Sequence, residues 1–245
     1  MPRALAHKSS IVDAMDMATL QAGDVEAFAM SLKLAFCTSL TLLVIGTPLS
    51  LWLALSRAPL VPIVHAMVSM PLVLPPTVLG FYLLLWFSPN GMIGQLFERL
   101  GTHAPAFSFT GLWLACVVVS LPFVVQPLQT AFSSIGRRPW EVAATLRCSP
   151  LKSFVRVIVP MARRGYLAAF TLAFAHTLGE FGVVLMVGGN IRGATQTIST
   201  TIFGHVEALD YASAHRLSAL LVVCGVVMVT IVQLASRRSR EARQE

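Results

Sequence analysis

Residues Leu34–Leu55 read LAFCTSLTLLVIGTPLSLWLAL, a run of 22 residues without a charged side chain. A helix needs about 20 consecutive, mostly apolar residues to cross the hydrocarbon core of a bilayer. Lys33 lies at the edge of this run, where its long side chain can extend to the membrane surface. The run therefore predicts a membrane-spanning helix, and the rest of the chain has to be compatible with lipid as its solvent.

Four more runs have a similar length and apolar character. They are Ile63–Phe87, Thr110–Phe132, Tyr166–Val187 and Leu217–Ala235. Of all 245 residues, 56% are apolar and 12% charged, whereas a typical soluble domain has about 25% charged residues. This composition excludes an ordinary soluble protein, and it excludes a disordered chain, which needs low hydrophobicity and high charge. We expect an all-α polytopic membrane protein with about five transmembrane helices.

Lysine and arginine residues are unequally divided among the segments that connect these runs. If the N-terminus lies outside, the inner segments carry twelve basic residues and the outer segments five. Cytoplasmic segments are enriched in Lys and Arg, so we expect the N-terminus outside and the C-terminus in the cytoplasm. The expected division is an outer segment 1–27, a membrane core 28–235 and a cytoplasmic tail 236–245. The net charge of +7 then reflects membrane orientation rather than nucleic-acid binding.

The second run contains the string SMPLVLPPTVLG, with Pro71, Pro75, Pro76 and Gly80. Proline removes a backbone donor and clashes with the preceding turn. In hydrocarbon, the freed carbonyl groups must find partners inside the protein. We therefore expect a broken helix close to a transport pathway, with Pro75, Pro76 and Thr77 as pathway candidates; the alternative is a helix that is merely kinked.

The inner segment Ser133–Arg164 is much longer than a connection between two helices requires, and its net charge is +6. Pro139 and Glu141 favour the start of one short helix, and Ser149 and Pro150 favour the start of another. We expect Pro160 to end the second helix. The first helix has a small, partly apolar surface for a cytoplasmic partner, formed by Trp140, Ala143, Ala144 and Leu146. The alternative is a basic loop that lies on the lipid surface.

The string from Glu141 to Pro160 resembles the EAA loop of type I ABC-importer permeases, the element through which these proteins contact their ATPase subunits. The chain differs from that pattern at Val142 and at Arg147, where the family has alanine and glycine, and it ends in Val157-Ile158-Val159-Pro160. The resemblance implies an ATPase-coupling role for Trp140, Glu141, Ala143, Ala144, Leu146, Arg147, Ser149 and Pro150. Arg147 would supply a charge contact, and Ser149 and Pro150 would define the break.

Two further strings, PLVLPPTVLGFYLLL at Pro71–Leu85 and HTLGEFGVVLMVGG at His176–Gly189, resemble the molybdate ABC-transporter permease. Asn190 and Thr195-Gln196-Thr197 extend the resemblance, which covers roughly residues 30–235. It implies a homodimer in the bacterial inner membrane, surrounded by lipid, with two cytoplasmic ATPase subunits. It also implies a periplasmic oxyanion-binding protein that delivers the substrate.

The chain has no Gly-rich phosphate loop, no HExxH and no GxSxG motif, and its four cysteines are far apart. We therefore expect a permease subunit without catalytic residues, cofactor or metal. Tungstate, sulfate and thiosulfate are alternative substrates, because these dianions differ little in what they require of a pore. A proton-coupled secondary carrier is a further alternative. Such carriers usually have internal inverted repeats, and we find no convincing internal repeat in this sequence.

His176 and Glu180 are four residues apart in the fourth run, a spacing that places them on one helix face. An acidic residue at the centre of a membrane helix costs about 2.5–3.5 kcal/mol on insertion scales. The pair is either a gate in the pathway or a hydrogen-bonded packing contact. We prefer the packing contact, because a fixed carboxylate would repel a dianion.

Two outer segments, Ser88–Ser108 and Gly189–Arg216, are long enough to contact another protein. We expect them to dock the binding protein, with Arg99, Arg192 and Arg216 available for its carboxylates. The alternative is that both segments are simple connectors.

Overall fold

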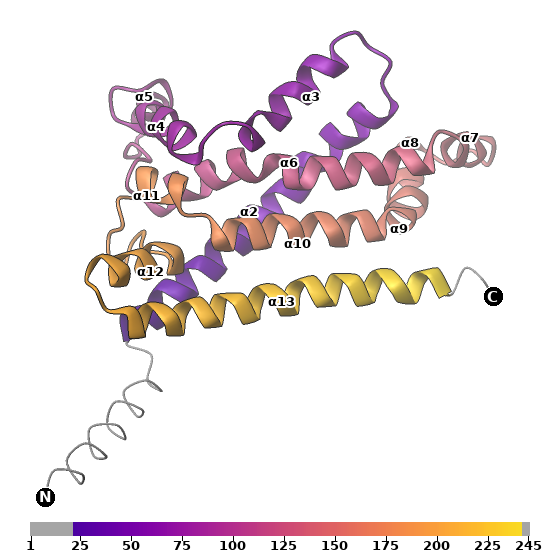
Figure 1. Cartoon of the computed structure of the whole chain (residues 1–245). Helices are drawn as coiled ribbons and strands as arrows, with labels where there is room; N and C mark the ends of the chain where they lie inside the picture. The colour runs from indigo at the N-terminus through magenta and orange to yellow at the C-terminus, as the bar shows by residue number, and fades with distance from the viewer. Residues whose placement is uncertain (1–21, 242–245) are drawn as a thin grey trace, which may run out of the picture.

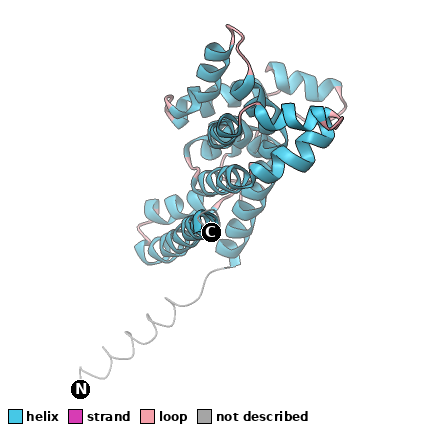
Figure 2. Ribbon diagram, turned by 90° about the vertical axis from the view of Figure 1, so that its right-hand side faces the viewer, coloured by secondary structure: helices cyan, strands magenta, loops and turns pink. Residues whose placement is uncertain are grey.

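The structure is a computed structural model that describes residues 22–241, with side chains placed for residues 23–230. Within this part of the chain every regular element is helical (Figures 1 and 2), which confirms the expected all-α fold. Residues 1–21 of the expected outer segment and residues 242–245 of the expected tail lie outside the described residues. The first helix, α2, begins at Ala22 and includes residues 22–27, which the sequence analysis had assigned to the outer segment.

Three helices are long and apolar enough to cross a membrane unaided, with candidate spans at Gly23–Leu55, Phe109–Ile135 and Tyr211–Thr230. They belong to α2 (Ala22–Leu55), α6 (Phe109–Ile135) and α13 (Tyr211–Glu241). Two bent helix pairs raise the number of spans to five if each pair is counted as one. These spans correspond in order to the five apolar runs of the sequence.

The second span is broken, as its prolines predict. It consists of α3 (Val61–Ser69), the 3₁₀ turn Met70–Leu72, α4 (Pro76–Phe87) and α5 (Met92–Arg99), with a bend of 106° at the break. Pro75 has an extended ψ of 134°, and Pro76 occupies the first turn of α4, where its missing N–H has no helical partner to lose.

The fourth span differs from the prediction of one helix over Tyr166–Val187. Helix α10 (Arg163–Gly179) ends before Glu180, whose backbone is extended with a ψ of 129°, and α11 (Gly182–Gly188) then begins. The prediction of an uninterrupted helix is wrong because Gly179 and Gly182 weaken the helix on both sides of Glu180. The helix at residues 163–179 is also bent by 72° against the segment Pro150–Met161 that precedes it.

The centre of the molecule is a core between α2, α6 and α10, which all pack against one another. Its fully buried members are Leu42 of α2, Val124, Leu128 and Phe132 of α6, Ile158, Ala162, and Ala169 and Ala173 of α10. Helix α13 contributes less to this core, and only 17% of its apolar window is buried. Its exposed valines, among them Val222 and Val226, suit contact with lipid.

The ends of the bundle carry different elements (Figure 1). Helices α5, α11 and α12 (Ile198–Glu207) lie at the end where α2 and α13 begin. Helices α7 (Arg138–Thr145), α8 (Pro150–Ser153) and α9 (Val159–Met161) lie at the other end, where α13 finishes. The basic segment is therefore on the same side as the C-terminal end of α13, as the expected topology requires.

Candidate functional site

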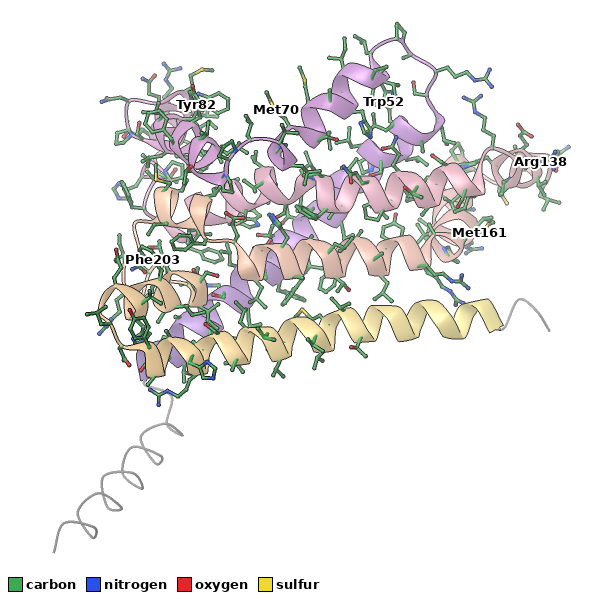
Figure 3. The ribbon with its side chains drawn as sticks, in the orientation of Figure 1. Trp52, Met70, Tyr82, Arg138, Met161 and Phe203 are labelled. Carbon is green, nitrogen blue, oxygen red and sulfur yellow. The ribbon has the colours of Figure 1, made fainter. Side chains whose placement is uncertain are left out.

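The segment between α6 and α10 forms a separate helical unit at one end of the bundle, where Figure 3 marks Arg138 and Met161. Pro139 and Glu141 lie in the first turn of α7, and Pro150 lies in the first turn of α8. The Ser149 hydroxyl accepts a hydrogen bond from the Lys152 amide at 3.4 Å, so Ser149 is the N-cap of α8. The prediction of two short helices, and of the residues that begin them, is confirmed.

The second helix runs from Pro150 to Met161 and ends beside the proline that was expected to end it. After α8, the π-helical turn Phe154–Ile158 leads into α9, and Pro160 lies in the first turn of α9. The chain bends at Ala162, two residues beyond Pro160. The second helix therefore ends at Met161, one residue after Pro160, and the prediction that this proline ends it is confirmed to within one residue.

Trp140 and Ala143 face the interior of this unit. The Trp140 ring stacks on Phe154 with a centroid distance of 6.2 Å and an interplanar angle of 21°, and it packs against the central core. Ala143 is 4% exposed. Both residues therefore hold α7 on the body of the protein; Trp140 is partly exposed, and its role in contacting an ATPase stays a prediction.

Other apolar side chains of the unit are exposed. Leu146 was expected among them and is 74% exposed, whereas Val142, Leu151 and Val155 were not recognised. The four-residue spacings from Val142 to Leu146 and from Leu151 to Val155 were the available signal, because such pairs share a helix face. Glu141 and Ala144 are also exposed. We call the set Val142, Leu146, Leu151 and Val155 the exposed apolar set.

The backbone at Arg147 explains why a glycine suits this position. Arg147 has a φ of +55°, in the left-handed region. Its amide bonds to the Ala144 carbonyl at 2.9 Å, and the next amide, of Cys148, bonds to the Ala143 carbonyl at 3.1 Å. This pair of bonds is the Schellman ending of a helix, whose left-handed residue is usually glycine. The turn, and not only the Ser149–Pro150 pair, therefore defines the break between the two helices.

The helical unit is also tied to α2. The Arg137 guanidinium donates a hydrogen bond of 2.6 Å to the Leu55 carbonyl at the C-terminal end of α2. A helix leaves its last carbonyl groups without intrahelical partners, and a guanidinium satisfies one of them here. The start of α7 is thus joined to both α6 and α2.

At the other end, the two broken spans meet where α4 packs against α11. A β-carbon on Gly182 would lie 2.8 Å from the Pro76 β-carbon, and one on Gly80 would lie 2.9 Å from the Met186 β-carbon. The pathway candidates Pro75, Pro76 and Thr77 are exposed beside this contact. The surface of this span is apolar, and Met70 and Tyr82 lie on the side away from α13 (Figure 3).

His176 and Glu180 do contact each other, with 3.7 Å between the His176 Nε2 and the Glu180 carboxylate. The other imidazole nitrogen is 3.0 Å from the Ser120 hydroxyl of α6, and the ring stacks on Phe123. Glu180 is 8% exposed and accepts a hydrogen bond from the Val183 amide at 3.1 Å. These contacts favour the packing interpretation, because the carboxylate caps α11 rather than facing an open path.

The sequence matches the family model described as binding-protein-dependent transport system inner membrane component over residues 46–241. The chain belongs to this family of membrane permeases. It is 53% identical over 215 residues to the molybdenum transport system permease protein ModB of Azotobacter vinelandii, covering 88% of this chain and 95% of that protein. It is also 37% identical to the Mycobacterium tuberculosis ModB, covering 83% of this chain and 76% of that protein.

Sulfate permeases are more distant relatives of this permease. The sulfate transport system permease protein CysT of Escherichia coli is 30% identical, and the match covers 88% of this chain and 78% of that protein. Among solved structures, a bacterial importer of the polysaccharide alginate has a TM-score of 0.67 at 16% identity, covering 91% of this chain and 80% of that one. The methionine transporter MetNI has a TM-score of 0.62 at 18% identity, covering 87% and 94%. The permease therefore has the type I ABC-importer fold, and the family is one of multi-pass inner-membrane proteins.

The end of the permease that carries α5 and α12 differs in one respect from the prediction. Arg99 and Arg192 are exposed at this end, as expected. Arg216, however, lies within α13 and donates a hydrogen bond to the Ser213 hydroxyl at 2.7 Å. The prediction of a loop up to residue 216 is wrong because α13 begins at Tyr211, five residues earlier. Among residues 22–241, no group of three His, Cys, Asp or Glu side chains is placed to hold a metal ion.

Proposed function

We propose that this permease is the membrane-spanning subunit of an ATP-driven importer for molybdate. The observation that carries the proposal is the 53% identity to a molybdenum permease over 88% of the chain, against 30% to a sulfate permease over the same share. Sulfate is the second candidate for this reason, and tungstate is a third because it is also a tetrahedral dianion.

The importer would contain two copies of the permease, two cytoplasmic ATPase subunits and a periplasmic binding protein. A single copy leaves an apolar surface on α3, α4 and the turn between them, with exposed Met67, Val73 and Trp86, which suits either lipid or a second copy. The N-terminus would lie in the periplasm and the C-terminus in the cytoplasm. This orientation places α7–α9 on the side of the ATPase and α5 and α12 on the side of the binding protein.

The substrate is tested in a reconstituted complex of permease, ATPase and binding protein. We expect molybdate-loaded binding protein to stimulate ATP hydrolysis and molybdate uptake, and sulfate-loaded protein to give at most a tenth of the stimulation. Equal stimulation by sulfate would reject the molybdate proposal and leave the oxyanion-importer class intact. No stimulation by any of the three anions would reject the class.

The exposed apolar set would bind the ATPase. Four exposed apolar side chains on a compact, basic unit provide the buried centre that a specific interface needs. We expect Leu146→Glu to prevent co-purification of the ATPase subunits. Leu100→Glu, at an equally exposed leucine at the opposite end of the bundle, is the matched control and should retain them. An ATPase that stays bound to the Leu146→Glu permease would exclude this set as the coupling surface.

A further inference from the structure

A stripe of polar side chains runs along the half of α6 nearest to α7. Gln126, Gln129, Thr130 and Ser133 are spaced by three and four residues, so they share one face of the helix. With His65 of α3 they line an open hollow of about 430 Å³. We call Gln126, Gln129, Thr130 and Ser133 the polar stripe.

The stripe extends to a depth where lipid would surround an exposed side chain. A helix of 27 residues such as α6 is about 40 Å long, whereas the hydrocarbon core is about 30 Å thick. Gln126 lies nine residues before Ile135, or about 14 Å from the end of α6. An amide that faces hydrocarbon without a partner is strongly unfavourable.

Within the described residues, the side-chain amides of this stripe have no hydrogen-bond partner in the protein. Within residues 22–241, the side-chain amides of Gln126 and Gln129 make no hydrogen bond, and the Thr130 hydroxyl donates only to the Gln126 backbone carbonyl at 2.9 Å. Gln126, Thr130 and Ser133 are exposed, while Leu128 and Phe132 on the opposite face of α6 are buried. The apolar face of α6 serves the core, and its polar face is left for water or a solute.

We propose that the polar stripe lines the inner half of the translocation path and hydrogen-bonds the tetrahedral oxyanion as it passes toward the side of α7. The proposal rests on the proposed function for the identity of the solute. Amide N–H and hydroxyl groups are neutral donors for anionic oxygen atoms. A path must bind its ion favourably enough to admit it and weakly enough to release it, which neutral donors provide.

The first experiment measures whether water reaches the stripe. The native Cys37, Cys116, Cys148 and Cys224 are replaced by alanine, and Gln126→Cys or Thr130→Cys is introduced into the complete complex in nanodiscs. Val222→Cys and Val226→Cys on the lipid-facing side of α13, 63% and 61% exposed, are the matched controls. We expect a charged, membrane-impermeant maleimide to label the stripe at least tenfold faster than the controls in one of the nucleotide states. Labelling no faster than the controls in every state would overturn the proposal.

The second experiment measures whether the stripe contacts the anion. Gln126→Glu and Gln129→Glu keep the shape of the side chain and add a negative charge when ionised. We expect each to reduce molybdate uptake at least tenfold while binding-protein-stimulated ATP hydrolysis persists. Gln126→Asn, which keeps the donor, should retain most uptake, and Gln95→Glu at the outer end should be neutral.

Uptake at the wild-type rate in both glutamate variants would overturn the contact. If a glutamate variant fails to assemble, the maleimide labelling rates of the cysteine variants still decide whether water reaches the stripe. If the wild-type complex imports a different oxyanion, the substrate proposal fails, and the same variants are tested with that anion.

Discussion

Arg147 occupies the left-handed position of the turn that ends α7, at a φ of +55°. A residue with a β-carbon is disfavoured there by about 1–2 kcal/mol, and part of this is offset because glycine loses more entropy on folding. We expect Arg147→Gly to stabilise the permease by about 0.5–1 kcal/mol and to leave ATPase coupling intact. Thermal unfolding of the purified complex measures the change. Arg147→Ala is the control, since it removes the charge without relieving the strain; equal stability of the two variants would argue against a strained turn.

The Glu180 carboxylate accepts a hydrogen bond from the Val183 amide at the start of α11. Variants of Glu180 can therefore distinguish a structural role of this bond from a gating role of the carboxylate charge. Losing such a capping bond costs about 0.5–2 kcal/mol, so we expect Glu180→Ala to lower the unfolding temperature. Glu180→Gln keeps an acceptor oxygen and should preserve both stability and uptake. Uptake lost in Glu180→Gln at unchanged stability would show that the carboxylate charge, rather than the cap, is required.

At the scale of the elements, the contact between α4 and α11 depends on small residues. A β-carbon on Gly182 would approach the Pro76 β-carbon to 2.8 Å, so one of the two broken spans would have to shift. We expect Gly182→Ala to destabilise the permease by about 1–3 kcal/mol and to reduce uptake. Gly225→Ala in α13 is the matched control, because nothing lies within 4 Å of its added carbon. Equal unfolding temperatures for the two variants would contradict a close contact.

The membrane-spanning helices were predictable from the length of their apolar runs. The points at which a helix breaks were not, because there a local side-chain contact competes with the helical hydrogen bonds. Uncharged runs such as Leu34–Leu55 must be helical in lipid, because only a helix satisfies its own backbone. The break at Glu180 was missed because a carboxylate that caps a new helix looks, in sequence, like one inside a continuous helix.

The orientation of α7 was missed for a different reason. Trp140 and Leu146 are both apolar, and only the position of Phe154 in space decides which of them is covered. The polar stripe was not predicted, because His65, which lines the same hollow, comes from a helix that is distant in the sequence.

At the scale of the whole molecule, His205 links three helix ends at the end of the bundle opposite α7. Its imidazole nitrogens lie 3.2 Å from the Asp24 carboxylate of α2 and 3.5 Å from the Asp210 carboxylate before α13. Hydrogen bonds from Ser213 lower the pKa of the Asp210 carboxyl below its ordinary value, and the charges of His205 and Arg216 add to this effect. A carboxyl whose pKa is lowered by folding stabilises the fold above the unfolded pKa of about 3.9.

This contribution is lost as the pH falls through the lower, folded pKa of Asp210. We therefore expect the unfolding temperature of the complex to drop below about pH 4, and the drop to be smaller in Asp210→Asn. Glu207→Gln, at an exposed neighbouring carboxylate, should show the same drop as the wild type. If the unfolding temperatures of Asp210→Asn and the wild type fall identically with pH, Asp210 does not cause the loss of stability in acid.

The 72° bend at Ala162 joins two arms of unequal length, Pro150–Met161 and Arg163–Gly179. At 1.5 Å per residue the arms measure about 18 Å and 25 Å. Because the two arms meet at this angle, a push along the short arm would move the long arm in a direction different from that of the push. A displacement imposed at the tip of the short arm would therefore change direction at Ala162 before it reached the Gly179 end, next to the junction of the two broken spans.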